Sequence, residues 1–161
     1  MKKFTLGSRI SLLKGRLTIL VKNAKTGEII SSNVYDNIQT LAGRRWHLES
    51  IQAGSGPAGE SITHMAVGTS TVPAADTQTT LTTEIFRKAI ASWDNTLLSA
   101  NPPKVTAEMT MTSTEGNGNT LTEVGLFTAA TAGTMLSRLV FPGQVKDNTL
   151  TIVFKYDLTS A

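Results

Sequence analysis

Side chains that commonly carry chemistry are scarce in this sequence. It contains two histidines, His47 and His64, and no cysteine. Neither histidine belongs to an HExxH motif or has a second ligand four residues on, so we expect hydrogen-bonded structural histidines and no metal site. No G-x-S-x-G element is present to activate a serine. The sequence therefore predicts no catalytic residue, no metal and no cofactor.

Two further patterns could carry chemistry, and both are weak. Residues 54–59, Gly-Ser-Gly-Pro-Ala-Gly, match G-x-G-x-x-G. A dinucleotide site needs that pattern between a strand and a helix, whereas here it is expected to follow a helix and precede a strand, so we interpret it as a connector. Glu108 and Glu123 could face each other across strands, as glycoside hydrolysis requires, but the sequence does not fix their separation.

The composition indicates a mainly β domain. Hydrophobic residues make up 40% of the 161 residues and charged residues only 17%, below the usual charged fraction of about 25%. A surface with so few charges is often partly covered by partners. Threonine is the commonest residue type and there are 13 glycines, which favours short strands joined by many turns.

Alternating apolar and polar residues predict most of the strands. The clearest covers residues 105–112, where one face carries Val105, Ala107, Met109 and Met111 and the other Thr106, Glu108, Thr110 and Thr112. The last strand places Leu150, Ile152, Phe154, Tyr156 and Leu158 on one face. The other expected strands cover residues 16–22, 28–35, 62–68, 84–93, 121–127 and 135–141, the last ended by Pro142-Gly143. Antiparallel strands at this spacing predict a β-sandwich, jelly-roll-like, with one short helix and an extended N-terminal arm.

That helix is expected near residues 37–52. Asp36 or Asn37 would cap it, and its buried face would carry Ile38, Leu41, Ala42, Leu48 and Ile51. Arg44 and Trp46 lie off this face. An exposed tryptophan beside a guanidinium is typical of an interface hot spot, although Trp46 could equally cover the edge of the helix.

Positive charge is concentrated at the start of the chain. Residues 1–27 hold seven lysines and arginines and no acid, a charge of +7, and the rest of the chain carries −4, which together give the net charge of +3. We therefore divide the chain into a basic arm with the first strand, residues 1–22, and a single sandwich domain, residues 23–161. The expected assembly interface consists of Lys2, Lys3, Arg9, Lys14, Arg16, Arg44, Arg45 and Trp46.

Several short segments, in their order along the chain, resemble a recurring small virion protein of tailed bacteriophages. They include residues 23–30 (NAKTGEII), 62–69 (ITHMAVGT), 123–127 (EVGLF) and 136–138 (LSR), with Phe141-Pro142 and the alternating last strand. The resemblance covers roughly residues 23–158, and the first 22 residues match least. It implies a structural protein of the tail, neck or fibre-attachment region, located in the virion and assembled in the cytoplasm of the bacterial host.

The expected function is accordingly assembly without catalysis. Partners would be other copies of the chain, in a trimer or a ring, and other phage structural proteins. A capsid decoration protein is the alternative. A nucleic-acid-binding module is disfavoured because the arm has one aromatic, Phe4, and the body is acidic. A carbohydrate-binding tip would use Tyr35, Trp46, Trp93 or Tyr156. No apolar run reaches the roughly 20 residues of a membrane span, so no membrane partner is expected.

Overall fold

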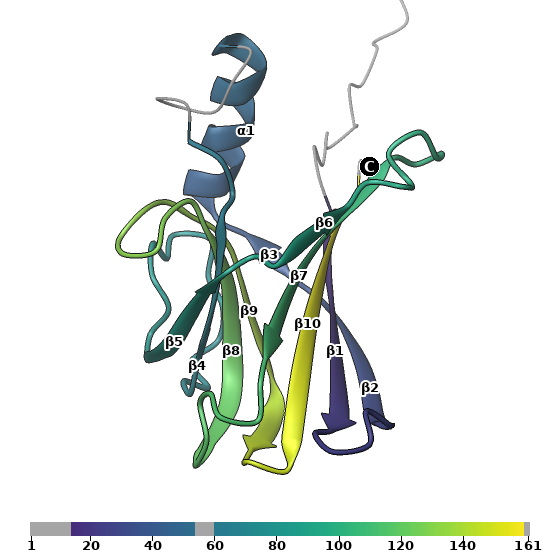
Figure 1. Ribbon diagram of the computed structural model, residues 1–161. Helices are drawn as coiled ribbons and strands as arrows, with labels where there is room; N and C mark the ends of the chain where they lie inside the picture. The colour runs from purple at the N-terminus through teal and green to yellow at the C-terminus, as the bar shows by residue number, and fades with distance from the viewer. Residues whose placement is uncertain (1–13, 54–59, 160–161) are drawn as a thin grey trace, which may run out of the picture.

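The protein folds as two five-stranded antiparallel sheets packed face to face (Figure 1). This computed structural model describes residues 14–53 and 60–159. The strands are β1 (Lys14–Asn23), β2 (Ile29–Asp36), β3 (Ile38–Gln39), β4 (His64–Gly68), β5 (Glu84–Ala89), β6 (Ser92–Asp94), β7 (Lys104–Met111), β8 (Asn119–Phe127), β9 (Met135–Lys146) and β10 (Leu150–Thr159), with one helix, α1 (Leu41–Ala53). The β-sandwich with a single short helix is confirmed; the arm up to residue 13 lies outside the described residues.

The first sheet has the strand order β2-β1-β10-β7-β6. β1 pairs with β10 along its whole length and with β2 on its other side. Asn23 and Gly27 make the turn between β1 and β2, with Gly27 at a φ of 73°, as the sequence indicated. Because β1 is hydrogen-bonded on both sides, it belongs to the sandwich. The division that grouped β1 with the arm in residues 1–22 is therefore corrected to a sandwich that includes residue 14.

The second sheet has the order β3-β9-β8-β4-β5. The sequence predicted one extended segment over residues 84–93, and here the structure differs. β5 pairs with β4 in the second sheet, whereas β6 pairs with β7 in the first. Between them the Ile90 amide donates to Thr63 and the Ala91 amide to Glu108. The two hydrogen bonds lead the chain from one sheet to the other.

β9 continues beyond the expected stop at Pro142-Gly143 and ends at Lys146. Proline has no N–H, so a central strand excludes it. The short β3 pairs only with Arg138 and Ser137, which leaves the later part of β9 on a sheet edge among the described residues. The β8–β9 register shifts between Leu121 and Glu123, opposite this part of β9. Proline fits there because no ladder hydrogen bond from its nitrogen is needed.

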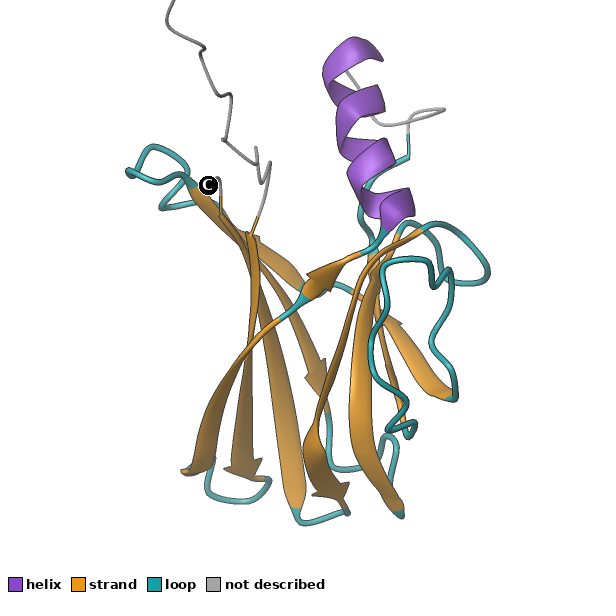
Figure 2. Cartoon of the chain, turned by 180° about the vertical axis from the view of Figure 1, so that it is seen from behind, coloured by secondary structure: helices purple, strands orange, loops and turns teal. Residues whose placement is uncertain are grey.

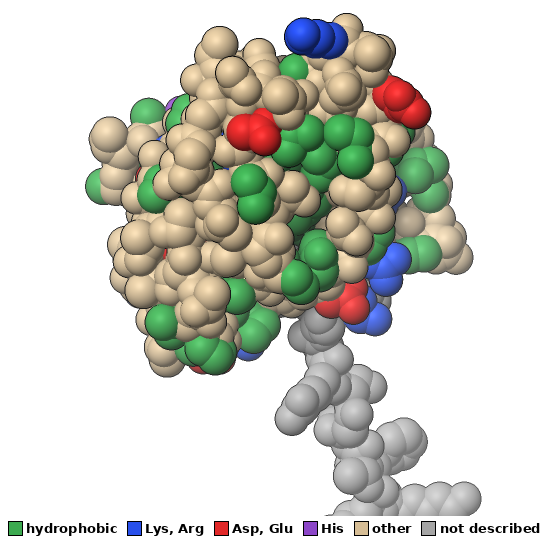
Figure 3. All heavy atoms as spheres, turned by 90° about the horizontal axis from the view of Figure 1, so that it is seen from below, with side chains coloured by type: hydrophobic (Ala, Val, Ile, Leu, Met, Phe, Trp, Pro, Cys, Tyr) green, Lys and Arg blue, Asp and Glu red, His purple; other side chains and the backbone are tan. Residues whose placement is uncertain are grey.

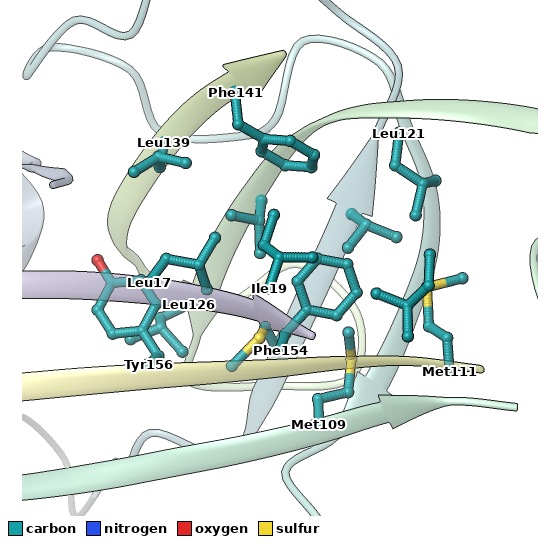
Figure 4. Packing of buried hydrophobic residues seen from close by; sticks show 14 of the residues in the cluster. Leu17, Ile19, Met109, Met111, Leu121, Leu126, Leu139, Phe141, Phe154 and Tyr156 are labelled. Carbon is teal, nitrogen blue, oxygen red and sulfur yellow. The ribbon is translucent and has the colours of Figure 1, made fainter. Parts of the chain in front are cut away.

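The core lies between the sheets and is built from the alternating residues of the strands (Figure 4). β10 contributes Ile152, Phe154 and Tyr156, and β7 contributes Ala107, Met109 and Met111, all fully buried. Leu150 and Leu158 pack at the margin of this cluster. The apolar faces predicted for both strands are confirmed.

The helix starts later than the sequence predicted. Residues 38 and 39 form β3, and the Thr40 hydroxyl, not Asp36 or Asn37, accepts a hydrogen bond from the Gly43 amide (2.9 Å). The same hydroxyl donates to the Met135 carbonyl, so the cap also ties α1 to β9. α1 stands at one end of the sandwich and projects away from the sheets (Figure 2).

The expected buried face of α1 is wrong. Leu41 and Leu48 are more than half exposed and Ile38 lies on β3, whereas Gly43 is buried and Trp46 packs against the core. α1 contacts β9 with its first turns, and a helix that projects from a sheet end buries little of its length. Helical periodicity alone did not reveal this orientation. The side chain of Ile51 is outside the described residues.

A second cluster, Ala66, Leu81, Phe127 and Met135, lies on the outer face of the second sheet. The segment 69–83 covers this face, and a buried ion pair holds the segment in place. Arg138 and Glu123 are both fully buried with an N–O distance of 2.8 Å. Glu123 accepts from the Thr82 and Thr83 amides, and Arg138 donates to Gln78 and to the Val72 carbonyl.

Candidate assembly surface

The end of the sandwich that carries α1, β3, β6 and the loop 95–103 has several hollows. We call it the α1 end. Six large apolar residues are exposed there: Ile38, Leu41, Leu48, Trp93, Leu97 and Leu98. The opposite end also shows apolar side chains grouped between scattered charges (Figure 3). At the α1 end, however, the exposed residues adjoin two grooves of different chemistry.

The first groove, the basic cleft, has a volume of about 610 Å³. Its lining consists of Lys14, Gly15, Arg16, Asp36, Asn37, Ile38, Gln39 and Arg44. Arg16 pairs with Asp36 at 3.3 Å, and both side chains are largely exposed. Arg44 pairs with Asp76 at 2.7 Å. Three cations against the two carboxylates that pair with them leave the cleft one net positive charge, suited to a negatively charged group of a partner.

The second groove, the tryptophan groove, has a volume of about 280 Å³ and is almost entirely apolar. Its lining consists of Trp46, His47, Ile62, Trp93, Leu98, Pro103, Lys104, Val105 and Leu158. α1 and the segment before β4 form one wall, and β6, β7, β10 and the loop 95–103 form the other. The groove is therefore the mouth of the interlayer core, left open at this end.

His47 lies between the two grooves. With Gly15, Gln39 and Leu158 it lines a small cavity of about 10 Å³, about the size of one water molecule. Burial lowers the pKa of His47, so the imidazole is neutral at pH 7. A Cβ at Gly15 would overlap the Asn37 side chain, which would then have to shift. The cavity shares lining residues with both the cleft and the groove and therefore lies between them.

The structure brings together four of the residues predicted for the interface. Lys14, Arg16 and Arg44 line the basic cleft, and Trp46 lines the tryptophan groove. Arg45 lies apart and pairs with Glu49 on α1 at 2.6 Å; this hydrogen bond raises the pKa of Arg45. Lys2, Lys3 and Arg9 lie outside the described residues, as does the Gly54–Gly59 connector.

Other sequence candidates do not assemble into a site. Glu108 and Glu123 belong to different sheets, and Glu123 lies under the segment 69–83, so they do not face each other. His64 on β4 hydrogen-bonds to the Thr63 hydroxyl through Nδ1 at 2.7 Å. In residues 14–53 and 60–159 no three metal-ligating side chains are grouped. The described part also has no helix long and apolar enough to cross a bilayer.

The four aromatic residues considered as sugar platforms separate into two pairs. Tyr156 is fully buried, and Tyr35 packs on Phe141 with 5.9 Å between ring centroids. Trp46 and Trp93 line the same groove, although they are 47 residues apart in the sequence. Sequence reasoning missed Ile62, Leu98 and Pro103 as members of this groove. The exposed pair Leu97-Leu98 close to two prolines was the available signal.

Comparisons with known proteins identify no relative of this chain. No protein-family model, no curated protein and no solved structure matches this chain.

Proposed function

We propose that the protein is a non-enzymatic structural subunit of a tailed bacteriophage particle. It acts in the tail, neck or fibre-attachment region and assembles through the α1 end. The observation that carries this proposal is the tryptophan groove beside the basic cleft. The order of sequence segments that resemble a phage virion protein supports the choice of particle.

Exposed apolar area at the α1 end favours a covered surface. The groove holds both tryptophans of the chain and Leu98, and Leu41 and Leu48 lie elsewhere on α1; all three leucines are about half exposed or more. Monomeric proteins rarely expose large contiguous apolar patches, and interface hot spots are enriched in tryptophan and arginine. Trp46, Trp93, Arg16 and Arg44 provide this combination on one end.

Light scattering of the purified full-length protein tests the self-assembly. We expect a defined oligomer, a trimer or a ring, that persists at high salt because its contacts are mainly apolar. Leu98→Lys at the α1 end should shift the mass towards the monomer. Val145→Lys, at an equally exposed valine on β9, is the control and should leave the mass unchanged. A monomer at every protein concentration would contradict self-assembly.

Particle fractionation tests the location. In a lysate of the bacteriophage that encodes the chain, the protein should sediment with purified tails. Recovery with tailless heads would instead support the capsid decoration alternative. If neither fraction contained the protein, the structural role would be wrong.

A further inference from the structure

We propose that the tryptophan groove binds residues 1–13 from a neighbouring copy of the chain. This inference rests on the proposed assembly role and specifies its contact. It follows from the groove, from the point where the described chain begins, and from the residue pattern of the 13 residues before that point.

The pattern of residues 1–13 is that of an extended segment with one apolar face. Phe4, Leu6, Ile10 and Leu12 share one face, with Ser8 as the polar residue between them. The other face carries Thr5, Gly7, Arg9 and Ser11, and its one apolar residue near the sandwich is Leu13. Successive side chains of a strand point to opposite faces. An extended segment with such a face needs an apolar surface to cover it. The tryptophan groove, with its almost entirely apolar lining, is such a surface.

The length of the segment fits the distances at the α1 end. Residue 13 precedes Lys14, which lines the basic cleft. β1 is three strand spacings from β6 in the first sheet, about 14 Å at roughly 4.8 Å per spacing. Thirteen extended residues reach about 43 Å. The segment is thus long enough to leave its own sandwich and lie along a groove of this kind.

Charge favours a neighbour's groove over the segment's own. Within one chain the segment would enter the groove past Lys14, Arg16 and Arg44, and would bring Lys2, Lys3 and Arg9 towards like charges. A neighbour's segment can enter from the β6 side. Asp94 lies there next to Trp93, and hydrogen bonds from the Thr96 amide and hydroxyl hold its carboxylate. The nearby Lys104 and Lys155 are paired with Asp157 and Glu108, so this side keeps one net negative charge. If each copy places its segment in the groove of another copy, the contacts are identical and the oligomer can be closed and symmetric.

Tryptophan fluorescence reports directly on the groove, because Trp46 and Trp93 are the only tryptophans. The test variant is full-length protein with Leu6→Ser and Ile10→Ser on the apolar face. Its emission should shift to the red, and acrylamide should quench it more strongly than in the parent. Self-association should weaken about tenfold or more. The matched control, Thr5→Ala with Ser11→Ala on the opposite face, should behave like the parent.

Mixing distinguishes a neighbour's segment from the chain's own. The Leu6→Ser/Ile10→Ser variant keeps an intact groove, and Leu98→Lys keeps an intact segment. Each alone should be largely monomeric, and an equimolar mixture should form a complex with one segment–groove contact, detected by light scattering. No complex in the mixture would overturn the inference.

Two other results would also overturn the inference, and they separate it from the proposed function. If the segment variant changes the fluorescence while parent and variant are both monomers, the chain's own segment fills the groove, and self-assembly fails as well. If the oligomer and its fluorescence are unaffected by the segment variant, another surface or partner covers the groove. The assembly role then stands without this contact.

Discussion

At the scale of the residue, the most consequential interaction is the ion pair between Glu123 and Arg138. Two fully buried charges are costly, and here the cost is offset by hydrogen bonds to both partners. Glu123 accepts hydrogen bonds from the segment 69–83, and Arg138 donates hydrogen bonds to the same segment. This segment contains no regular strand or helix. The pair therefore fixes a loop on the outer face of the second sheet.

Removal of one member of the Glu123–Arg138 pair should show how far the stability of the fold depends on it. Glu123→Ala leaves the Arg138 guanidinium buried without its counter-charge, and we expect a loss of about 3–5 kcal/mol in the free energy of unfolding by urea. Glu108→Ala is the control because its pair with Lys155 is partly exposed, and it should cost less than about 1 kcal/mol. Equal losses for the two variants would show that the buried pair is not what holds the loop.

Because of Tyr156, we expect the free energy of unfolding to depend on pH in the alkaline range. Burial raises the pKa of its phenol, whereas in the unfolded chain the group loses its proton near pH 10. Above about pH 10 the unfolded state therefore binds fewer protons than the folded state, and stability falls as the pH rises. Tyr156→Phe should lessen this fall, by up to about 1.4 kcal/mol per pH unit.

Urea unfolding between pH 8 and 11 measures the effect of the Tyr156 substitution. Tyr35→Phe, at the other tyrosine of the chain, controls for the loss of a phenol in general. Parallel stability curves for the parent and Tyr156→Phe would contradict the assignment.

At the scale of the element, the docking of α1 depends on close approach. The first turn lies against β9, where the Thr40 amide donates to the Leu136 carbonyl at 3.1 Å. A Cβ at Gly43 would overlap that carbonyl. The helix consequently stands beside the groove in one orientation, and it places Trp46 in the wall while Leu41 and Leu48 face outward.

Gly43→Ala tests this contact. Alanine is the better helix former by up to about 1 kcal/mol, yet the overlap requires a shift of α1 that costs about 1–3 kcal/mol. We expect a net destabilisation in thermal unfolding and a change in tryptophan emission as Trp46 moves. Arg45→Ala, at an exposed position on the same helix that lines neither groove, should change neither quantity appreciably. A stabilised Gly43→Ala protein would show that the approach is not tight.

At the scale of the whole molecule, β1 connects the edge strand β2 to the other strands of the first sheet. It pairs with both β2 and β10, so without it β2 loses its strand partner and β10 loses the partner on one side. A chain of residues 14–161 should keep the parent's cooperative unfolding and lose self-assembly. A chain of residues 23–161 should not fold, as circular dichroism would show. If the shorter chain folded cooperatively, β1 would be dispensable and the domain boundary at residue 23 would be right after all.

Local sequence patterns predicted most of the strands, the core faces of β7 and β10, and the class of fold. Alternation in β7 and β10 is a local property, because a strand buried on one face must repeat every second residue. The Asn23–Gly27 turn followed from its residue types, because glycine adopts a positive φ at low cost. Lys14, Arg16, Arg44 and Trp46, which the sequence grouped by charge and residue type, lie at the α1 end, and their role in an interface stays a prediction.

Only the tertiary structure decided which strands share a sheet, how α1 is oriented and where the grooves lie. Residues 84–93 are divided between the sheets by hydrogen bonds to Thr63 and Glu108, which are distant in sequence. Trp46 and Trp93 meet because the sandwich is open at the α1 end. Glu123 and Arg138 are buried because a loop folds over them. Each outcome depends on packing between remote segments, and local periodicity carries no information about such contacts.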